Sequence, residues 1–396
     1  MQRERKMKLN KHYSELNESY LFSTIAHKVA AYQKVNPDKD IIRLGIGDVT
    51  LPLAKSVTDA MLKAVEEQGK KETFHGYIPS EQGYEFLRSA IQKYYAGHGV
   101  ELDMAEIFVS DGAKSDLGNL LDLFDVDNTV LVPDPVYPVY VDDNVMAGRK
   151  IVFADANEEN GFLPDLDELR SLIKPNTRLI CLNNHNNPTG ALMDQPMLEA
   201  IVAMAREVGA YVLCDEVYRH LTQTDVWSAS IVDLYEKGIS IGSMSKVFSL
   251  AGLRLGWVAS HDADFINACL SRRDYSLISC GMFDEAVASL ALRHSHALLA
   301  RNRGIVRDNL AILTDWVEKE KRVHFVRPQA GTTALLFYDS PMPSYVFCEK
   351  LLAQTGALLT PGACFELEGC ARIGYACDGN ELKAGLAAIS STLDTL

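Results

Sequence analysis

The fold is decided by one stretch of the sequence, residues 179–215, which is LICLNNHNNPTGALMDQPMLEAIVAMAREVGAYVLCD. Its two ends, residues 179–182 and 211–214, are short apolar runs that predict buried strands. Between them Asp194 can cap a helix that Gly209 ends. Apolar side chains recur along this helix every three or four residues, at Leu198, Val202, Ala205 and Val208. The stretch therefore predicts a strand, a covering helix and a second strand.

The same alternation extends over most of the chain. The candidate strands are residues 107–109, 130–132, 151–154, 179–182, 211–214, 240–242 and 257–259. Because these runs are nearly all apolar, we expect an α/β fold with a mostly parallel, seven-stranded sheet covered by helices on both faces. Such sheets bind ligands at the carboxyl ends of their strands, so the residues that follow each run are the candidates for chemistry.

The pattern changes after about residue 290. A helical stretch, about Glu285–Glu318, leads to shorter strands at 333–337 and 371–374. We therefore predict an N-terminal arm with part of a small domain, a large domain and a smaller α+β domain, over residues 1–47, 48–290 and 291–396. The arm has too little apolar pattern to fold alone, so we expect it to lie on the small domain or on a partner subunit.

Composition excludes several classes of protein. The 396 residues include 39 basic and 53 acidic side chains, a formal net charge of −14. Such an acidic chain is a poor match for a phosphate backbone, so we expect no nucleic-acid partner. No apolar run approaches the ~20 residues of a membrane-spanning helix, so we expect no membrane segment.

The eight cysteines indicate which metal and redox sites are absent from the sequence pattern. None forms a Cys-x-x-Cys pair, so the sequence predicts neither a zinc site nor a redox pair, and no metal is expected. Several lie in apolar runs. We interpret them as buried free thiols of a protein in the reducing cytoplasm.

Residues 243–257, SMSKVFSLAGLRLGW, follow a candidate strand and are the most informative segment. A lysine that forms a Schiff base must be nucleophilic, and a neighbouring cation such as Arg254 favours the neutral amine of Lys246. Ser243, Ser245 and Arg254 offer hydroxyl and guanidinium donors that suit a phosphate. The alternative is a solvated lysine at a strand end.

Polar residues also follow two other candidate strands. A buried carboxylate at Asp215 favours the protonated form of a pyridine ring, and Tyr218 can donate a hydrogen bond to a phenolic oxygen on such a ring. Asn187 can bond the same oxygen. The alternatives are an aspartate that caps the next helix and a plain Asn-Pro turn. His185 fits a loop residue better than a catalytic base.

Three further features are weaker. The run VSDGAKSD at 109–116 predicts a helix start after a strand, where backbone N–H groups suit a phosphate. Tyr137 can stack on a flat ring, whereas Tyr140 fits core packing better. Arg372, in a short strand, can clamp a carboxylate through two parallel hydrogen bonds, although a lone arginine is usually a surface residue.

Taken together and in this order, these runs resemble the fold-type I, class I/II pyridoxal-phosphate aminotransferases. The resemblance implies a pyridoxal 5′-phosphate (PLP) cofactor, bound covalently by Lys246, and a substrate α-carboxylate on Arg372. The implied contacts to the cofactor come from Gly112, Ala113, Lys114, Tyr137, Asn187, Asp215, Tyr218, Ser243, Ser245, Lys246 and Arg254. The implied catalytic residues are Lys246, Asp215 and Tyr218. Such an enzyme moves an amino group from an amino acid to a 2-oxo acid, and it is usually a homodimer with shared active sites.

Within that family, the first half resembles the LL-diaminopimelate aminotransferases, through runs such as RLGIGDVT at 43–50. By that resemblance, Tyr77 reaches the cofactor phosphate of the neighbouring subunit, and Glu81 reaches the neighbour's substrate amino group. Tyr20 and Gly47 contact the substrate, as Asn187 also does.

Two departures from that subfamily bear on the substrate. Ile78-Pro79-Ser80 before Glu81 adds one residue, which shifts the carboxylate. The run Ile278–Gly281 stands where the subfamily has Phe-Asn-Gly, so an asparagine expected at the distal end of diaminopimelate is missing. The expected acceptor is 2-oxoglutarate. A class I/II aminotransferase of other specificity, or a lyase or cyclase on the same scaffold, is the alternative.

Overall fold

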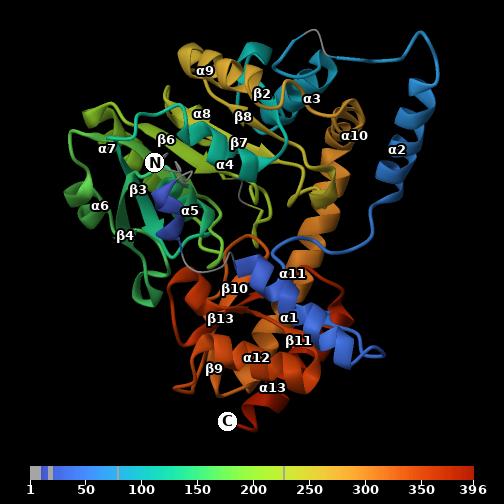
Figure 1. Ribbon diagram of the computed structural model, residues 1–396, viewed down its shortest axis with the longest axis vertical. Coiled ribbons are helices and arrows are strands. Elements are labelled where there is room, and N and C mark those ends of the chain that lie inside the picture. Colours follow the sequence, from blue (N-terminus) through green and yellow to red (C-terminus); the bar gives the residue numbers. More distant parts are fainter. Residues whose placement is uncertain (1–9, 17–20, 78–79, 226–227) are drawn as a thin grey trace, which may run out of the picture.

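The computed structural model describes residues 10–16, 21–77, 80–225 and 228–396, and Figure 1 shows its two main sheets with their helices. Short 3-10 helices occur at η1 (Lys11–Ser14), η2 (Met104–Glu106), η3 (Glu158–Asn160), η4 (Ala251–Leu253) and η5 (Gly362–Phe365). Within these described ranges, no helix combines the length and the apolar character needed to cross a bilayer.

The larger sheet has seven strands. In spatial order they are β2 (Ile107–Ser110), β8 (Gly256–Ala259), β7 (Gly238–Ser243), β6 (Tyr211–Asp215), β5 (Thr177–Asn183), β3 (Thr129–Asp134) and β4 (Lys150–Asp155). β8 runs antiparallel to both of its neighbours, and all other pairs are parallel. Each candidate run lies within one of these strands, so the predicted mostly parallel, seven-stranded sheet is confirmed.

Helices cover both faces of this sheet, as predicted. One face packs on α3 (Glu85–Ala96), α6 (Leu166–Leu172), α7 (Gln195–Val208), α8 (Ile231–Leu234) and α10 (Met282–Arg293). The other packs on α4 (Ala113–Leu121), α5 (Val139–Met146) and α9 (Ala263–Asp274). α2 (Lys55–Gln68) lies beside α10. The strands therefore bury side chains on both faces, which explains their nearly continuous apolar sequences.

α7 forms as its sequence predicts. The Asp194 side chain accepts a hydrogen bond from the Met197 amide (3.0 Å) and so satisfies a donor of the first turn. Gly209 ends the helix with a φ of 69°, a left-handed conformation that glycine adopts without steric cost. The helix buries Leu198 and Val202 against the sheet.

A second, antiparallel sheet lies in the C-terminal third. Its order is β12 (Thr360–Pro361), β13 (Cys370–Gly374), β10 (Thr333–Tyr338) and β9 (Val323–His324), and it packs with α12 (Ser344–Thr355) and α13 (Gly379–Leu393). The predicted short strands lie in β10 and β13. The domain boundaries at residues 47/48 and 290/291 stay a prediction.

The predicted continuous helix at 285–318 is wrong in one respect. The chain breaks at His294, between α10 and α11 (Ser295–Lys319). α10 packs into the large core, whereas α11 carries Leu299 into that core and Leu310 into the small one, so the two helices take separate paths. No glycine or proline marks residue 294 in the sequence.

The N-terminal residues divide between the two parts of the molecule. α1 (Leu21–Val35) packs Val29 against Leu358, and β1 (Ile42–Arg43) pairs in parallel with β11 (Ala357–Leu358). These segments lie on the small part, as expected. The described residues 10–16 lie elsewhere, because the Asn10 side chain donates to the Met146 carbonyl at the end of α5 (3.1 Å).

Close approach of β7 and β8 gives a test of this packing. Gly242 faces Trp257 across the two strands, and an added Cβ would lie 2.2 Å from the indole ring. Gly242→Ala should therefore lower the free energy of unfolding by about 1–3 kcal/mol, because the core would be overpacked. Gly304→Ala, in α11, meets nothing within 4 Å and should raise it by about 0.5–1 kcal/mol.

Urea unfolding of the two variants measures both changes. Equal effects of the two alanines would contradict this packing of β7 on β8.

Candidate active site

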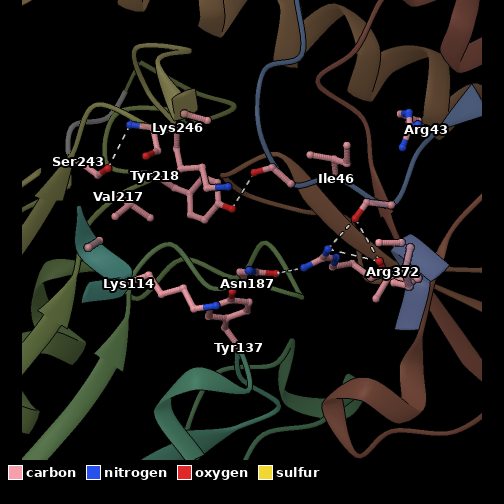
Figure 2. A pocket seen from close by; sticks show the side chains of 18 of the residues that line it. Arg43, Ile46, Lys114, Tyr137, Asn187, Val217, Tyr218, Ser243, Lys246 and Arg372 are labelled. Atoms are coloured by element: carbon pink, nitrogen blue, oxygen red, sulfur yellow. Dashed lines mark hydrogen bonds between the residues drawn. The ribbon is translucent and has the colours of Figure 1, made fainter. Parts of the chain in front are cut away.

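One cavity of about 590 Å³ lies at the carboxyl ends of β5, β6 and β7. Asn183, Asp215 and Ser243, the last residues of these strands, line it with residues of α1, β1 and β13 (Figure 2). The predicted site residues that line it are Gly47, Ala113, Lys114, Tyr137, Asn187, Asp215, Tyr218, Ser243, Ser245, Lys246, Arg254 and Arg372. The structure thus brings together residues from seven separate parts of the sequence.

Asp215 is buried at the end of β6, and both of its carboxylate oxygens accept hydrogen bonds. The Val217 amide donates to Oδ1 (3.0 Å), and the Tyr140 hydroxyl donates to Oδ2 (2.5 Å). Burial raises the pKa of Asp215 to about 6, although the two donors and the Lys246 cation oppose the rise. The cavity therefore contains a carboxylate that a neighbouring cation would readily keep ionised.

Lys246 follows β7 and extends into the cavity from the turn that begins at Ser243. The Ser245 amide donates to the Ser243 hydroxyl (3.0 Å), which closes this turn. The Lys246 amine lies 5.8 Å from the centre of the Tyr218 ring. The Tyr218 hydroxyl, which we expected to meet a ligand oxygen, donates to the Gly47 carbonyl (2.8 Å). This phenol is therefore held against the segment that follows β1. Figure 2 shows Lys246 and Tyr218 side by side.

Gly112 and Arg254 form a tight corner at the start of α4. Gly112 caps this helix with a φ of 117°, which favours glycine, and an added Cβ would lie 3.0 Å from the Arg254 Nη2 atom. Arg254 itself has a φ of 54°, and its Nη1 atom donates to the Ala251 carbonyl (2.9 Å). Gly112 does not line the cavity, but its lack of a side chain allows the guanidinium to lie over the helix terminus.

Arg372, predicted to hold a carboxylate, lies on β13 and is only 1% exposed. Its Nη1 atom donates to the Asn187 Oδ1 atom (2.9 Å), and its Nη2 atom donates to the Gly45 carbonyl (2.7 Å) and, more weakly, to the Thr360 hydroxyl (3.4 Å). All of these acceptors are uncharged. Arg372 is therefore not a surface residue, and its guanidinium is held at the cavity wall.

Tyr137 and Lys114 lie together on the opposite side of the cavity from Lys246 (Figure 2). Lys114 stands in the first turn of α4, and Tyr137 precedes α5. Asn187 lies between this pair and Arg372 in the same view. Its backbone amide donates to the Asn183 side chain (2.7 Å), which fixes the loop after β5.

Other predicted residues lie away from the cavity. Tyr77 is 87% exposed, and Glu81 is exposed as well. Tyr20 lies outside the described residues, as Ile78 and Pro79 do. The Glu81 carbonyl accepts a hydrogen bond from Arg273 (2.7 Å), so this segment is fastened to the large part although its side chains face outward.

Sequence reasoning missed two residues of the site. Tyr140 fitted core packing and is buried, but its hydroxyl also reaches Asp215. The signal was available, because a buried tyrosine usually finds a partner for its hydroxyl, and Tyr140 follows Tyr137 by three residues. Asn183 received no role, although it ends a strand beside Asp215 and lines the cavity.

The remaining polar candidates lie apart from this chemistry. All eight cysteines are free, as predicted. Seven of them are buried, as predicted, whereas Cys364 is partly exposed. His185 is buried behind the loop after β5, where burial lowers its pKa to about 3 and its ring contacts the Ser228 hydroxyl (3.2 Å). Among the residues that the structure describes, no group of three or more His, Cys, Asp or Glu side chains is arranged to hold a metal.

The buried charge of Asp215 should make the stability of the cofactor-free protein pH-dependent. Its pKa is about 6 in the folded protein and about 3.9 in an unfolded chain, so the stability that it contributes is lost as pH rises through 6. Asp215→Asn lacks this loss. Its thermal stability relative to the native protein should therefore increase between pH 5 and pH 7.5, by about 1.4 kcal/mol. A difference in melting temperature that stays constant over this range would contradict the buried, raised pKa.

Comparisons with known proteins identify the family of the chain. The family profile "Aminotransferase class I and II" matches residues 39–389. An LL-diaminopimelate aminotransferase from Lachnospira eligens is 46% identical over 270 residues, which cover 63% of this chain and 64% of that protein, just under two thirds of its length. Another, from Methanosphaera stadtmanae, is 43% identical over 400 residues, which cover 92% of this chain and 93% of that protein.

A solved structure extends the likeness to three dimensions. A PLP-dependent aminotransferase from Streptococcus suis is 35% identical and superimposes with a TM-score of 0.82, covering 93% of this chain and 97% of its own. The profile, the relatives and the fold agree over nearly the whole length that forms the cavity. The chain belongs to the class I and II aminotransferase family.

Proposed function

We propose that this chain is a PLP-dependent aminotransferase that moves an amino group from LL-diaminopimelate to 2-oxoglutarate. One observation carries the proposal: the side chains of Lys246, Asp215 and Arg372 line a single cavity. Together they offer a nucleophilic amine, a buried carboxylate and a buried cation. The printed names of the two curated relatives support the choice of donor.

The cavity residues fit PLP. Ser243, Ser245 and Arg254 bring hydroxyl and guanidinium donors to the first turn of α4, where exposed backbone N–H groups attract a phosphate. The missing side chain of Gly112 lets the Arg254 guanidinium approach this helix start, where its charge suits the same anion. Tyr137 offers an aromatic face for a flat ring. Tyr77 would approach the phosphate from a second subunit.

The proposed chemistry divides among three residues. When bound, PLP supplies a protonated pyridine ring that accepts the electron pair left on the substrate α-carbon. Asp215 holds the proton on the ring nitrogen, because its carboxylate favours the charged form of the ring. The Lys246 amine would hold the cofactor until the substrate amino group displaces it. The freed amine would then take the proton from the substrate α-carbon and pass it to the carbon that takes up the amino group. Tyr218 and Asn187 offer hydrogen bonds around the same ring.

Arg372 suits the substrate α-carboxylate. Its guanidinium already bonds to the neutral oxygens of Asn187 and Gly45. A carboxylate in their place makes shorter, charge-assisted bonds and fixes the orientation of the α-carbon. Gly47 lines the same cavity, and its lack of a side chain lets the Tyr218 hydroxyl approach, because an added Cβ would lie 3.2 Å from that oxygen.

We also propose a homodimer with shared active sites. Large apolar side chains are exposed before α3, between α9 and α10, and in the first turn of α10. They are Phe74, Tyr77, Tyr275, Leu277, Ile278 and Phe283. Arg273 ties these segments together through the Glu81 carbonyl. Such a surface suits a second copy of this chain. Glu81 would then face the neighbour's substrate, as Tyr20 would face the substrate from the N-terminal arm.

The proposed location is the cytoplasm. The eight free cysteines support it, because a reducing compartment keeps thiols unpaired.

A donor screen tests the proposed reaction. With 2-oxoglutarate as acceptor, LL-diaminopimelate should yield glutamate faster than lysine, arginine, aspartate or aromatic amino acids. Lys246→Ala should lower turnover at least about 10²–10⁴-fold, because the general base is removed. Lys150→Ala, an exposed lysine, is the matched control and should retain activity. Transfer from another donor only would overturn the substrate, and ammonia release without glutamate would favour a lyase.

Subunit complementation tests the shared site. Glu81→Gln should lower kcat/KM for LL-diaminopimelate about 10–100-fold, because a charged hydrogen bond to the substrate is lost. Glu72→Gln, an exposed neighbour, is the control. When Glu81→Gln and Lys246→Ala subunits exchange at random, half of the dimers have one intact site, so activity should recover to about one quarter of the native value.

If Glu81 acts within its own subunit, the mixed dimers have no intact site. Activity would then not rise above that of the separate variants, and the shared site would be disproved.

A further inference from the structure

Tyr140 occupies a position that the proposed chemistry does not yet use. It lies in the first turn of α5, is buried, and does not line the cavity. Its hydroxyl nevertheless donates to the Asp215 Oδ2 atom at 2.5 Å, from behind the carboxylate. Burial, followed by the charge of Asp215, raises the pKa of Tyr140 well above its usual value, so the phenol keeps its proton and remains a donor.

The surroundings of Asp215 make this donor important. The nearby charged groups are Lys246, which stabilises the carboxylate, and Glu216 and Asp116, which oppose it. The thiols of Cys181 and Cys214 lie close by and stay neutral, because burial raises their pKa values. Burial raises the pKa of Asp215 to about 6, and each hydrogen bond to the charged form opposes this rise. Loss of one such bond therefore moves the pKa toward neutral pH.

We propose that Tyr140 is a positioning residue that acts through Asp215 and sets the pH range over which the site binds a protonated pyridine ring. The inference rests on the proposed PLP cofactor. A phenylalanine would fill the same space among the apolar side chains of α4 and α5, so the contribution of the hydroxyl is electrostatic. Without it, Asp215 gains a proton at higher pH and loses its attraction for the ring.

Pyridoxamine 5′-phosphate is the suitable probe, because it lacks an aldehyde and forms no covalent bond with Lys246. Loss of one charge-assisted hydrogen bond moves the pKa of Asp215 from about 6 to about 7. Tyr140→Phe should therefore bind this probe about fivefold more weakly than the native protein at pH 6, and equally well at pH 8. Calorimetric titration of the dialysed protein from pH 5.5 to pH 8.5 measures both affinities.

Two further variants separate this role from general packing. Tyr235→Phe is the matched control, because it also removes one buried phenolic hydrogen bond, to the Ala210 carbonyl (2.6 Å), but lies away from the cavity. Its affinity for the probe should follow the native pH profile. Asp215→Asn combined with Tyr140→Phe should depend on pH no more than Asp215→Asn alone, because the hydroxyl acts through the carboxylate.

Replacement of Tyr140 by 3-fluorotyrosine keeps the packing and folding intact and makes the phenol a stronger donor. The fall in affinity at low pH should then begin at lower pH than in the native protein.

Loss of affinity by the same factor at pH 6 and pH 8, or the same shift in Tyr235→Phe, would overturn the role of Tyr140. So would an unchanged profile with fluorotyrosine. Failure of the native protein to bind the probe at any pH would instead overturn the proposed cofactor.

Discussion

The charge of Asp215 is the constraint on which the site depends. A carboxylate is placed where burial opposes its ionisation, and the fold compensates with donors and one cation that converge on it from different elements. This convergence is possible because β5, β6 and β7 run in parallel and end at one edge. The first turns of α4 and α5 then approach the same edge, so Lys114 and the Tyr140 hydroxyl come from helices that cover one face of the sheet.

Much of this arrangement could be predicted from the sequence. The strands were evident because both faces of the sheet are covered, so their sequences are apolar without interruption. Asp215 and Asn187 could be located as candidates because they follow such strands directly. In a parallel sheet, residues that follow the carboxyl ends of neighbouring strands lie at one edge, however far apart they are along the chain.

The details of the hydrogen bonding could not be predicted in the same way. Tyr140 and Asp215 are 75 residues apart, and Arg372 and Asn187 are 185 residues apart. Such contacts depend on how helices and the small sheet pack on the large one, which local periodicity does not encode. The break at His294 could not be predicted for the same reason. It arises because α10 and α11 pack on different surfaces, and no residue that disfavours a helix marks it in the sequence.

α11 has a mechanical consequence for the molecule. This one helix carries Leu299 in the larger hydrophobic core and Leu310 in the smaller one. The two attachments lie about three helical turns apart on one continuous helix, so α11 ties the orientation of the small sheet to that of the large one. A change in the angle between the two sheets would therefore have to bend this helix or repack it in one of the two cores.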